Sequence, residues 1–460
     1  MTLAHLKDIL SGAGLYMLEL DYDRALLVDL YELTMAAAYF EQRMDCRATF
    51  QLFVRQLPAE RAYLVAGGIE DALAYLASLR FSQEQVNFIR SLPVFRAVSS
   101  RFFEYLLDFR FTGDVEAVEE GTLVFAEEPL LQVSAPILEA QIVETYLLSV
   151  ANFETLIASK AARVVGAARG RGVLEFGTRR AQGPEAGLRA ARSAYLGGCV
   201  ATSNVLAGFR YGIPLAGTAA HSWTQAFPTE RQSFEALLDT FPEDAILLID
   251  TYDPIAGAET AATLGRRIAG VRIDSGDLLA LSRQVREILD SHGLSEAKIV
   301  ASGDLNEYKV EALLAQGAPI DLFGVGTELA TSRDVPALNV VYKLVELERN
   351  GHVDYKSKFS EDKVYLPGRK QVFRFSAGAH YHHDTIARSS EDFPEGAPLL
   401  HPVMRDGRRL KSRPCLQDAR ANALANLARL PEPYHALRNA PAYPVVKSEA
   451  LLHLLEEVRE

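Results

Sequence analysis

The feature that most constrains the fold is a module that occurs six times after Gly172: a short apolar strand, a polar or glycine-containing turn, and a helix. The strand ends read VLEFGTRR (173–180), IPLAGTAAH (213–221), AILLIDTYD (245–253), GVRIDSGD (270–277), KIVASGDL (298–305) and IDLFGVGT (320–327). Such alternation predicts a parallel sheet covered by helices. Because the strands are apolar on both faces, we expect an irregular barrel rather than an open sheet.

Capping residues mark where the helices between these strands begin and end. Asp277 and Asp304 stand where two predicted helices begin, and Glu307 follows Asp304 at the spacing of a capping box. Gly293 and Gly317 stand where those helices end, since glycine readily adopts the left-handed conformation that closes a helix. Regular helices are therefore expected between the last strands of the barrel.

The chain of 460 residues exceeds what one hydrophobic core usually supports, and we expect three units. Residues 1–168 predict a mixed α+β domain, with a helix at LYELTMAAAYF, a strand at ATFQLFV and a long helix from near Pro136. Residues 169–350 are expected to form the α/β barrel that carries the active site. Residues 351–460 turn polar and predict a small C-terminal appendage packed on the other two units.

Composition limits the partners of this chain. Its formal net charge of -12 argues against nucleic acid and acidic membrane surfaces, because neither anion is attracted by the summed field. The three cysteines are too few and too dispersed for a disulfide framework or a zinc site. The first 20 residues lack a signal-peptide pattern, and no apolar run reaches membrane-spanning length. We expect a cytoplasmic protein, in which HYHHD (380–384) forms a solvated loop rather than a metal site.

Glycine-containing turns follow two successive strands of the predicted barrel. In SGD (302–304) and GVGT (324–327), backbone N–H groups could approach a phosphate, and the next helix adds partial positive charge. Carboxylates beside a phosphate suit sugar hydroxyls or Mg²⁺. Those at the neighbouring strand ends are Asp250, Asp253, Asp274 and Asp277. A phosphorylated sugar with Mg²⁺ satisfies both observations, although each cluster alone also fits a helix cap or a plain turn.

Two arginine sites are expected at the same edge of the sheet. Phe176 and Arg179 are three residues apart after a strand, so an aromatic face and a guanidinium plane could enclose a flat ring. Arg272 and Asp274 alternate along a strand and point the same way. Arg272 could bind a carboxylate, and the alternative for this pair is a buried structural salt bridge.

Together these residues resemble the nicotinate phosphoribosyltransferase family, from about Leu26 to Arg374 and in the order that the family has. The motifs that carry the resemblance are LYELTM (30–35), EFGTRRAQGPEA (175–186), TSNVLAGFRYGIPLAGTAAHS (202–222), VRIDSGDL (271–278), ASGDL, GVGTEL and YLPGRKQVFR (365–374). The resemblance implies an N-terminal mixed domain and an irregular α/β barrel of the type II phosphoribosyltransferase kind. It also implies a homodimer with active sites at the interface.

The activity implied by the resemblance is the ATP-coupled synthesis of nicotinate mononucleotide from nicotinate and phosphoribosyl pyrophosphate with Mg²⁺, the first step of NAD salvage from nicotinate. The resemblance makes His221 the side chain that ATP phosphorylates, and a neutral imidazole offers a suitable nucleophilic nitrogen. By the same resemblance, Thr218 and Arg272 are expected to hold the nicotinate carboxylate. Phe176 and Arg179 are expected to enclose the nicotinate ring.

The remaining roles also come from the resemblance. Tyr31 is expected to reach the nicotinate ring from the partner subunit. Four residues of the glycine-containing turns would take the ribose and phosphates of phosphoribosyl pyrophosphate, namely Gly303, Asp304, Gly326 and Thr327. Asp250 and Asp274 are expected to support the histidine, the sugar or the metal, and the metal ligands themselves are left open.

Three rival functions remain open on the sequence. Nicotinamide-using relatives place an aspartate in the stretch that here reads TSNVLAG, whereas this chain has Ser203 and Asn204. Quinolinate-using relatives would call for a larger basic cluster and no phosphorylated histidine. A non-catalytic sensor of nucleotides or phosphosugars could also use this barrel, although His221, Arg272 and Asp274 together favour an enzyme.

Overall fold

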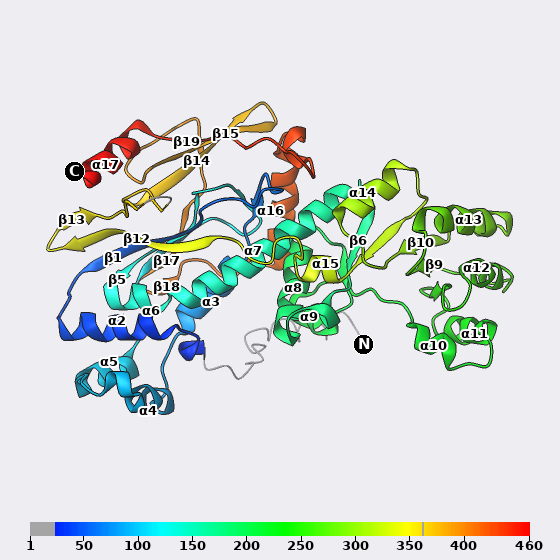
Figure 1. Ribbon diagram of the computed structural model, residues 1–460, viewed down its shortest axis with the longest axis horizontal. Coiled ribbons are helices and arrows are strands. Elements are labelled where there is room, and N and C mark those ends of the chain that lie inside the picture. Colours follow the sequence, from blue (N-terminus) through cyan, green and yellow to red (C-terminus); the bar gives the residue numbers. More distant parts are fainter. Residues whose placement is uncertain (1–23, 361–362) are drawn as a thin grey trace.

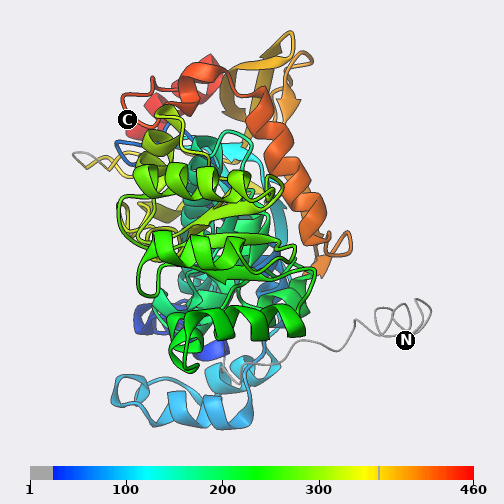
Figure 2. The same ribbon diagram turned by 90° about the vertical axis from the view of Figure 1, so that its right-hand side faces the viewer.

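The computed structural model describes residues 24–360 and 363–460, and it is elongated, with two sheet-containing halves joined by a long central helix (Figure 1). One half holds a seven-stranded sheet and a four-stranded sheet, and the other holds a six-stranded sheet. Seen from the end of the molecule in Figure 2, the six-stranded sheet and its green helices lie in front of the remaining elements.

The seven-stranded sheet is built from three distant parts of the chain. Its strands in spatial order are β13 (His352–Tyr355), β12 (Val340–Arg349), β1 (Arg47–Val54), β5 (Pro129–Pro136), β3 (Asp114–Ala117), β17 (His401–Arg405) and β18 (Arg408–Arg409). β1 pairs antiparallel with β12 from Arg47↔Glu348 to Val54↔Val340. Strand pairing thus crosses the predicted boundaries at residues 168 and 350. The division of the chain into three units at these boundaries stays a prediction.

Helices and a small ribbon complete this half of the molecule. They are η1 (Arg24–Leu26), α2 (Leu30–Glu41), β2 (Leu64–Val65), α3 (Ile69–Ser78), α4 (Gln83–Ser91), η2 (Pro93–Phe95), α5 (Ser100–Asp108), β4 (Leu123–Val124), α6 (Ile137–Ile142) and α7 (Glu144–Ala167). The predicted long helix from Pro136 is therefore two helices, because the chain turns at Val143 between α6 and α7. Most of α7 is buried, since it runs between the two halves (Figure 1).

The six-stranded sheet confirms the predicted parallel α/β architecture. Its strands in spatial order are β7 (Ala201–Thr202), β6 (Gly172–Glu175), β11 (Leu322–Val325), β10 (Lys298–Ala301), β9 (Gly270–Ile273) and β8 (Ile246–Leu248). Every neighbouring pair is parallel. The sheet curls as a half-barrel, with β7 and β8 at its two edges. The fold class predicted from the sequence is thus confirmed.

The helices of the half-barrel follow its strands along the chain. They are η3 (Thr178–Arg180), α8 (Pro184–Leu196), α9 (Val205–Tyr211), α10 (His221–Gln225), α11 (Glu230–Thr240), α12 (Pro254–Ala262), α13 (Leu278–Ser291), α14 (Glu307–Ala315) and α15 (Thr327–Ala330). Asp277 caps α13 as predicted, accepting from the N–H groups of Leu279 and Ala280. Gly293 and Gly317 follow their helices with φ of +74° and +73°, as expected.

Two predicted elements of the half-barrel are wrong. Residues 213–221 are not a strand, because only Leu215 makes a β-bridge, to Thr202, and Pro214 has no N–H to donate to a ladder. The corresponding strand is β7, which comes before α9. Asp304 does not cap a helix, since Asn306 caps α14 by accepting from the N–H of Lys309.

The C-terminal segment adds a four-stranded sheet and two helices. The elements are β14 (Lys370–Ala377), β15 (His380–Arg388), β16 (Ala397–Pro398), α16 (Leu416–Arg429), η4 (Glu432–His435), β19 (Val445–Lys447) and α17 (Glu449–Arg459). HYHHD lies in β15, so the predicted solvated loop is wrong. Its Tyr381 and Asp384 are buried, and Asp384 pairs with the buried Arg374 at 2.5 Å.

A buried group of charges joins α7 to the half-barrel. Glu307, the first residue of α14, lies 2.6 Å from the ammonium of Lys160 and accepts from Arg163 at 3.1 Å. Arg61 lies 3.6 Å from the same carboxylate and 2.9 Å from Asp334. These contacts fix α14 and the loop before it against the central helix. None of the helices in the described ranges is both long enough and apolar enough to span a membrane.

Candidate functional site

Most of the predicted site residues of the half-barrel gather where the parallel strands end. We call this region the barrel mouth; it comprises residues 176–180, 217–221, 272–277, 302–304 and 326–327. The carboxyl ends of adjacent parallel strands meet at one edge, so side chains from β6, β9, β10 and β11 converge there. The approach to α10 brings Thr218 and His221 to the same edge.

Arg272, near the end of β9, is the centre of the hydrogen-bond network at the barrel mouth. Its Nε donates to Ser302 Oγ at 2.8 Å, one terminal nitrogen donates to Thr218 Oγ1 at 2.7 Å, and the other donates to Asp274 Oδ1 at 2.6 Å. A guanidinium has five N–H groups, so two remain for a ligand. The two alternatives from the sequence, a salt bridge and a carboxylate-binding group, are therefore compatible with each other.

Asp274 links Arg272 to the histidine. Its Oδ1 also accepts from Ser302 Oγ at 2.5 Å, and its Oδ2 lies 4.0 Å from His221 Nε2. Burial alone would raise the pKa of Asp274, but the hydrogen bond from Ser302 and the charge of Arg272 hold that pKa below its usual value. Asp274 is thus a stable carboxylate beside the imidazole.

His221 is the first residue of α10, and its side chain is 42% exposed. Its Nδ1 lies 3.2 Å from Thr251 Oγ1, so the hydroxyl of Thr251 fixes the ring from one side while Nε2 faces Asp274. The imidazole is therefore oriented by the protein and also reachable from solvent. This combination suits a side chain that reacts with a ligand.

Asp250 acts on the site through the backbone. Its Oδ2 accepts from the N–H of Asp274 at 2.9 Å and from Ser275 Oγ at 2.9 Å, which holds the turn after β9. Its Oδ1 is buried and has no hydrogen-bond partner among the described residues. Asp253 caps α12, and Asp277 caps α13, so these two carboxylates have the plain structural role that the sequence left open.

The turn after β10 approaches β9 very closely. Gly303 has φ of +99°, and a Cβ at this position would lie 1.9 Å from the carbonyl oxygen of Asp274. Asp304 also has a left-handed backbone, with φ of +46°. Only glycine fits the first position, and the resulting turn exposes Gly303 and Asp304 to solvent at the barrel mouth.

The aromatic ring of Phe176 lies between the strands at the barrel mouth. A Cβ on Gly324 would come within 2.7 Å of this ring, so the glycine of β11 makes room for it. The guanidinium carbon of Arg272 lies 5.8 Å from the centre of the same ring. Arg179, in η3, is exposed. Phe176 thus contacts Arg272 directly, which the sequence spacing did not reveal.

Gly326 and Thr327 start the short helix α15 after β11. Gly326 precedes its first turn with φ of -111° and ψ of -99°, and Thr327 is its first residue. A Cβ on Gly326 would lie 3.2 Å from the carbonyl oxygen of Phe176, so the two loops pass close to each other. A Cβ on Gly324 would lie 3.2 Å from Cβ of Ser302, so the two predicted glycine-containing turns are also adjacent in space.

Sequence reasoning missed polar residues that shape the barrel mouth. Ser302 joins Arg272 to Asp274, and Thr251 contacts His221. Glu175 is buried at the end of β6, where it accepts from Thr202 Oγ1 at 2.6 Å and from the N–H of Gly177, and burial raises its pKa. Ser302, Thr251 and Glu175 all lie inside motifs that the sequence analysis singled out, but none of them was recognised as a polar partner of the site.

Tyr31 does not belong to the barrel mouth of its own chain. It lies on α2, is 45% exposed, and is in the other half of the molecule from α10 (Figure 1). Burial, followed by the charges of Glu144 and Glu32, raises its pKa above the usual value. A role for Tyr31 at this site would require a second copy of the chain.

Three family profiles match the chain in order. The nicotinate phosphoribosyltransferase N-terminal domain matches residues 26–152, the nicotinate phosphoribosyltransferase family matches residues 172–365, and the C-terminal domain of that enzyme matches residues 394–455. The chain belongs to the nicotinate phosphoribosyltransferase family. This membership confirms the resemblance that the sequence motifs indicated.

Individual relatives of the nicotinate phosphoribosyltransferase family match nearly the whole chain. A nicotinate phosphoribosyltransferase of Mycobacterium tuberculosis is 45% identical, covering 95% of this chain and 94% of its own. The Bacillus subtilis nicotinate phosphoribosyltransferase is 38% identical, covering 93% and 94%. The crystal structure of human nicotinic acid phosphoribosyltransferase has a TM-score of 0.82 and 30% identity, and the match covers 94% of this chain and all of that one.

The close approach at Gly303 generates a test of the barrel mouth. We expect Gly303→Ala to lower the free energy of unfolding by about 1–3 kcal/mol, because an L-residue is strained at this φ and its Cβ meets a backbone oxygen. Gly217→Ala is the matched control, since a Cβ added there would have no neighbour within 4 Å and its φ is not left-handed. Denaturant unfolding measures both, and equal stabilities would contradict the described geometry.

Proposed function

We propose that this chain synthesises nicotinate mononucleotide from nicotinate and phosphoribosyl pyrophosphate, coupled to ATP hydrolysis through a phosphorylated His221. The observation that carries the proposal is Arg272, which sits against the ring of Phe176 with two N–H groups left over for a carboxylate. A pyridine ring bearing a carboxylate matches this pair. Family membership supports the same substrate.

In this proposal nicotinate lies on Phe176. Its carboxylate takes the remaining donors of Arg272, and Thr218, which already accepts from Arg272 at 2.7 Å, completes the contact. A charge-assisted contact from a planar guanidinium is strong and directional. Arg179 covers the other face of the ring from η3.

Phosphoribosyl pyrophosphate occupies the two glycine-containing turns. Gly303 and Asp304 bind the ribose, and Gly326 with Thr327 brings backbone N–H groups and the start of α15 to the phosphates. The pyridine nitrogen then displaces pyrophosphate at the anomeric carbon. Positive charge develops on the ribosyl ring during this step, and the carboxylate of Asp274 stabilises it.

His221 couples the reaction to ATP. Thr251 and Asp274 orient its ring, so the exposed imidazole nitrogen attacks the terminal phosphoryl group and adenosine diphosphate leaves. Hydrolysis of the phosphohistidine then drives a synthesis that is otherwise poorly favourable. Asp250 is a positioning residue in this scheme, because it holds the backbone of Asp274.

Mg²⁺ fits the barrel mouth as an ion that arrives with phosphates. Among the described residues, no group of three histidine, cysteine or acidic side chains could hold a metal by itself. Mg²⁺ usually takes one or two carboxylates together with substrate phosphates. Asp250 and Asp253 lie near Glu230, whose pKa burial and these two carboxylates raise to about 6, so negative potential gathers here. When bound, the ion would neutralise the leaving pyrophosphate.

We further propose that the chain acts as a homodimer in which Tyr31 completes the nicotinate site of the partner subunit. The support is geometric: α2 lies far from the barrel mouth of its own chain, and Tyr31 stays 45% exposed (Figure 1). A cytoplasmic location agrees with the acidic composition and the free cysteines.

Product analysis with the purified chain tests the proposed substrate. We expect nicotinate, phosphoribosyl pyrophosphate, ATP and Mg²⁺ to yield nicotinate mononucleotide, detected by chromatography. Nicotinamide should react poorly, because Ser203 and Asn204 stand in the stretch where nicotinamide-using relatives have an aspartate, and the side chain of Asn204 caps α9. Equal or faster reaction with nicotinamide would overturn the assignment, and ATP binding without any product would favour a sensor.

Arg272→Ala separates the ligand role of this residue from its structural role. We expect KM for nicotinate to rise about 10- to 100-fold, because a hydrogen bond to a charged group contributes about 1.5–3 kcal/mol. Ser302→Ala is the control, since it removes a neighbour of Arg272 and leaves the guanidinium in place. The proposal fails if the folded Arg272→Ala protein, checked by circular dichroism, keeps its KM.

His221→Ala tests the coupling to ATP. We expect loss of ATP hydrolysis and of the acid-labile phosphoryl label on the protein, with a slow ATP-independent transfer that remains because the other substrate contacts are intact. His292→Ala is the control, since His292 lies at the opposite end of α13 from the barrel mouth. The measurement is labelling with γ-labelled ATP, and equal labelling of both variants would assign the phosphoryl group to another residue.

A further inference from the structure

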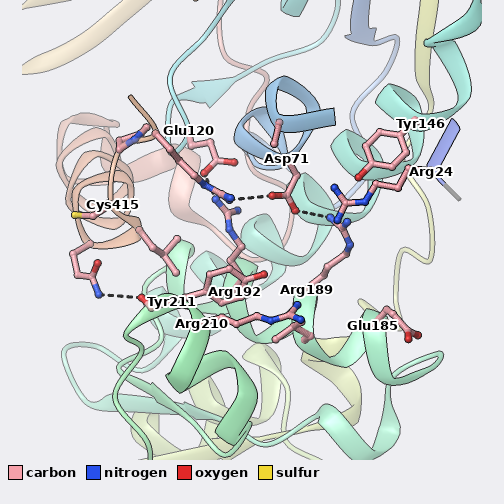
Figure 3. Close-up of a pocket in the computed structure, with 16 residues that line it drawn as sticks. Arg24, Asp71, Glu120, Tyr146, Glu185, Arg189, Arg192, Arg210, Tyr211 and Cys415 are labelled. Atoms are coloured by element: carbon pink, nitrogen blue, oxygen red, sulfur yellow. Dashed lines mark hydrogen bonds and ion pairs between the residues drawn. The ribbon is translucent and has the colours of Figure 1, made fainter. Parts of the chain in front are cut away.

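A cavity outside the barrel mouth lies between α3, α7, α8, α9 and the start of α16 (Figure 3). It has a volume of about 330 Å³, within the range of roughly 300–1,000 Å³ that small-molecule sites occupy. We propose that this cavity, here called the arginine pocket, binds a small phosphate-bearing anion. Its lining residues come from three segments of the chain, 24–146, 185–211 and 413–417, so a ligand in the pocket would contact all three segments.

Positive charge predominates in the arginine pocket. The basic side chains in its lining are Arg24, Arg189, Arg192, Arg210 and Arg413. The acidic ones are Asp71, Glu120 and Glu185. Glu154 pairs with two of the arginines, so the described residues at this cavity comprise five arginines and, with Glu154, four carboxylates. In a chain of net charge -12, such a local excess of guanidinium groups favours an anion, and their planar forks match phosphate oxygens.

Arg192 supplies an unused donor. It is 2% exposed, and its terminal nitrogens bind Glu154 at 2.8 Å and Glu120 at 2.6 Å. Its Nε is buried and has no hydrogen-bond partner within the described ranges. Buried polar groups in native proteins are nearly always paired, so an orphaned N–H beside a cavity points to a partner outside the described residues.

Arg24 supplies an unused charge. Its side chain has no hydrogen-bond or ion-pair partner among residues 24–360 and 363–460. In Figure 3 it points toward Asp71 and Arg189. Arg189 already shares Asp71 with Arg413, at 2.7 and 2.9 Å, and also binds Glu154 at 2.6 Å, so two carboxylates face three guanidinium groups. An anion bound between them would relieve this repulsion.

Tyrosine rings form part of the remaining wall. Tyr146 and Tyr211 line the arginine pocket, and the guanidinium of Arg192 lies 5.9 Å from the centre of the Tyr211 ring. Flat aromatic surfaces beside cations accept a planar group as well as a phosphate. The ligand is therefore either a free phosphate ion or a nucleotide that carries one, and its phosphate is the recognised group in both cases.

Cys415 provides a local probe. It is exposed and lines the arginine pocket, whereas Cys46 and Cys199 are buried. The experiment alkylates the full chain with neutral iodoacetamide and follows Cys415 by mass spectrometry, in inorganic phosphate and in chloride of equal ionic strength. Phosphate should slow alkylation of Cys415. The Arg24→Gln/Arg413→Gln variant should need about tenfold or more phosphate for the same protection, since each contact to a charged group is worth about that factor.

Arg405→Gln is the matched control. Arg405 makes one ion pair, with Asp114, and is 58% exposed, much as Arg413 makes one with Asp71 and is 42% exposed. This variant removes one positive charge, as Arg24→Gln does, and should keep full protection. Arg24→Gln alone removes no contact within the described residues, so it keeps the test decisive if the double variant is unstable. Alkylation of the wild type at equal rates in both salts, or equal protection of all variants, would overturn the proposal.

A second arm replaces phosphate by adenosine monophosphate. Half-maximal protection at a lower concentration of the nucleotide would identify a nucleotide site, in which the tyrosine rings contact the base. Equal protection by both compounds would identify the phosphate ion as the ligand. Either result supports the arginine pocket as an anion site.

Discussion

The buried carboxylate of Glu307 is the contact on which the arrangement of the two halves depends. It lies at the start of α14, is fully buried, and faces Lys160, Arg163 and Arg61. Removing one member of such a group typically costs about 3–5 kcal/mol, because a buried charge is left without its counterpart. The turn at residues 302–304 leads directly into this helix. The position of the loop that closes over β9 is thus set by the central helix α7 of the other half.

At the barrel mouth, buried residues that hold their neighbours differ from residues that are exposed to solvent. Asp250 and Ser302 direct their hydrogen bonds to Asp274 and Arg272, whereas His221 and Arg179 remain accessible. The exposed side chains of the barrel mouth are therefore supported by neighbours that are less exposed to solvent. Such support keeps a site rigid while its front stays open for substrates.

Local signals in the sequence predicted local structure well. Five of the six predicted strands, the cap at Asp277 and the closing glycine Gly293 need only neighbouring residues, and the structure confirms them. The contacts of Arg272 could not be predicted, because Ser302 and Thr218 reach it from other segments of the chain. HYHHD was assigned by composition, whereas it pairs with β14, and a register shift between Tyr381 and His383 allows both Tyr381 and Asp384 to be buried.

The pairing of β1 with β12 has a consequence for how the chain folds. β1 leaves the ribosome early, but its neighbour β12 is made only after the whole half-barrel. Contacts so distant in sequence form slowly, because a long loop must close first. During synthesis one edge of β1 therefore stays unpaired until β12 is made. An unpaired strand edge can pair with other chains and cause aggregation. All six strands of the half-barrel, from β6 to β11, are made between β1 and β12, so the folding of the half-barrel brings β12 back to the unpaired edge of β1.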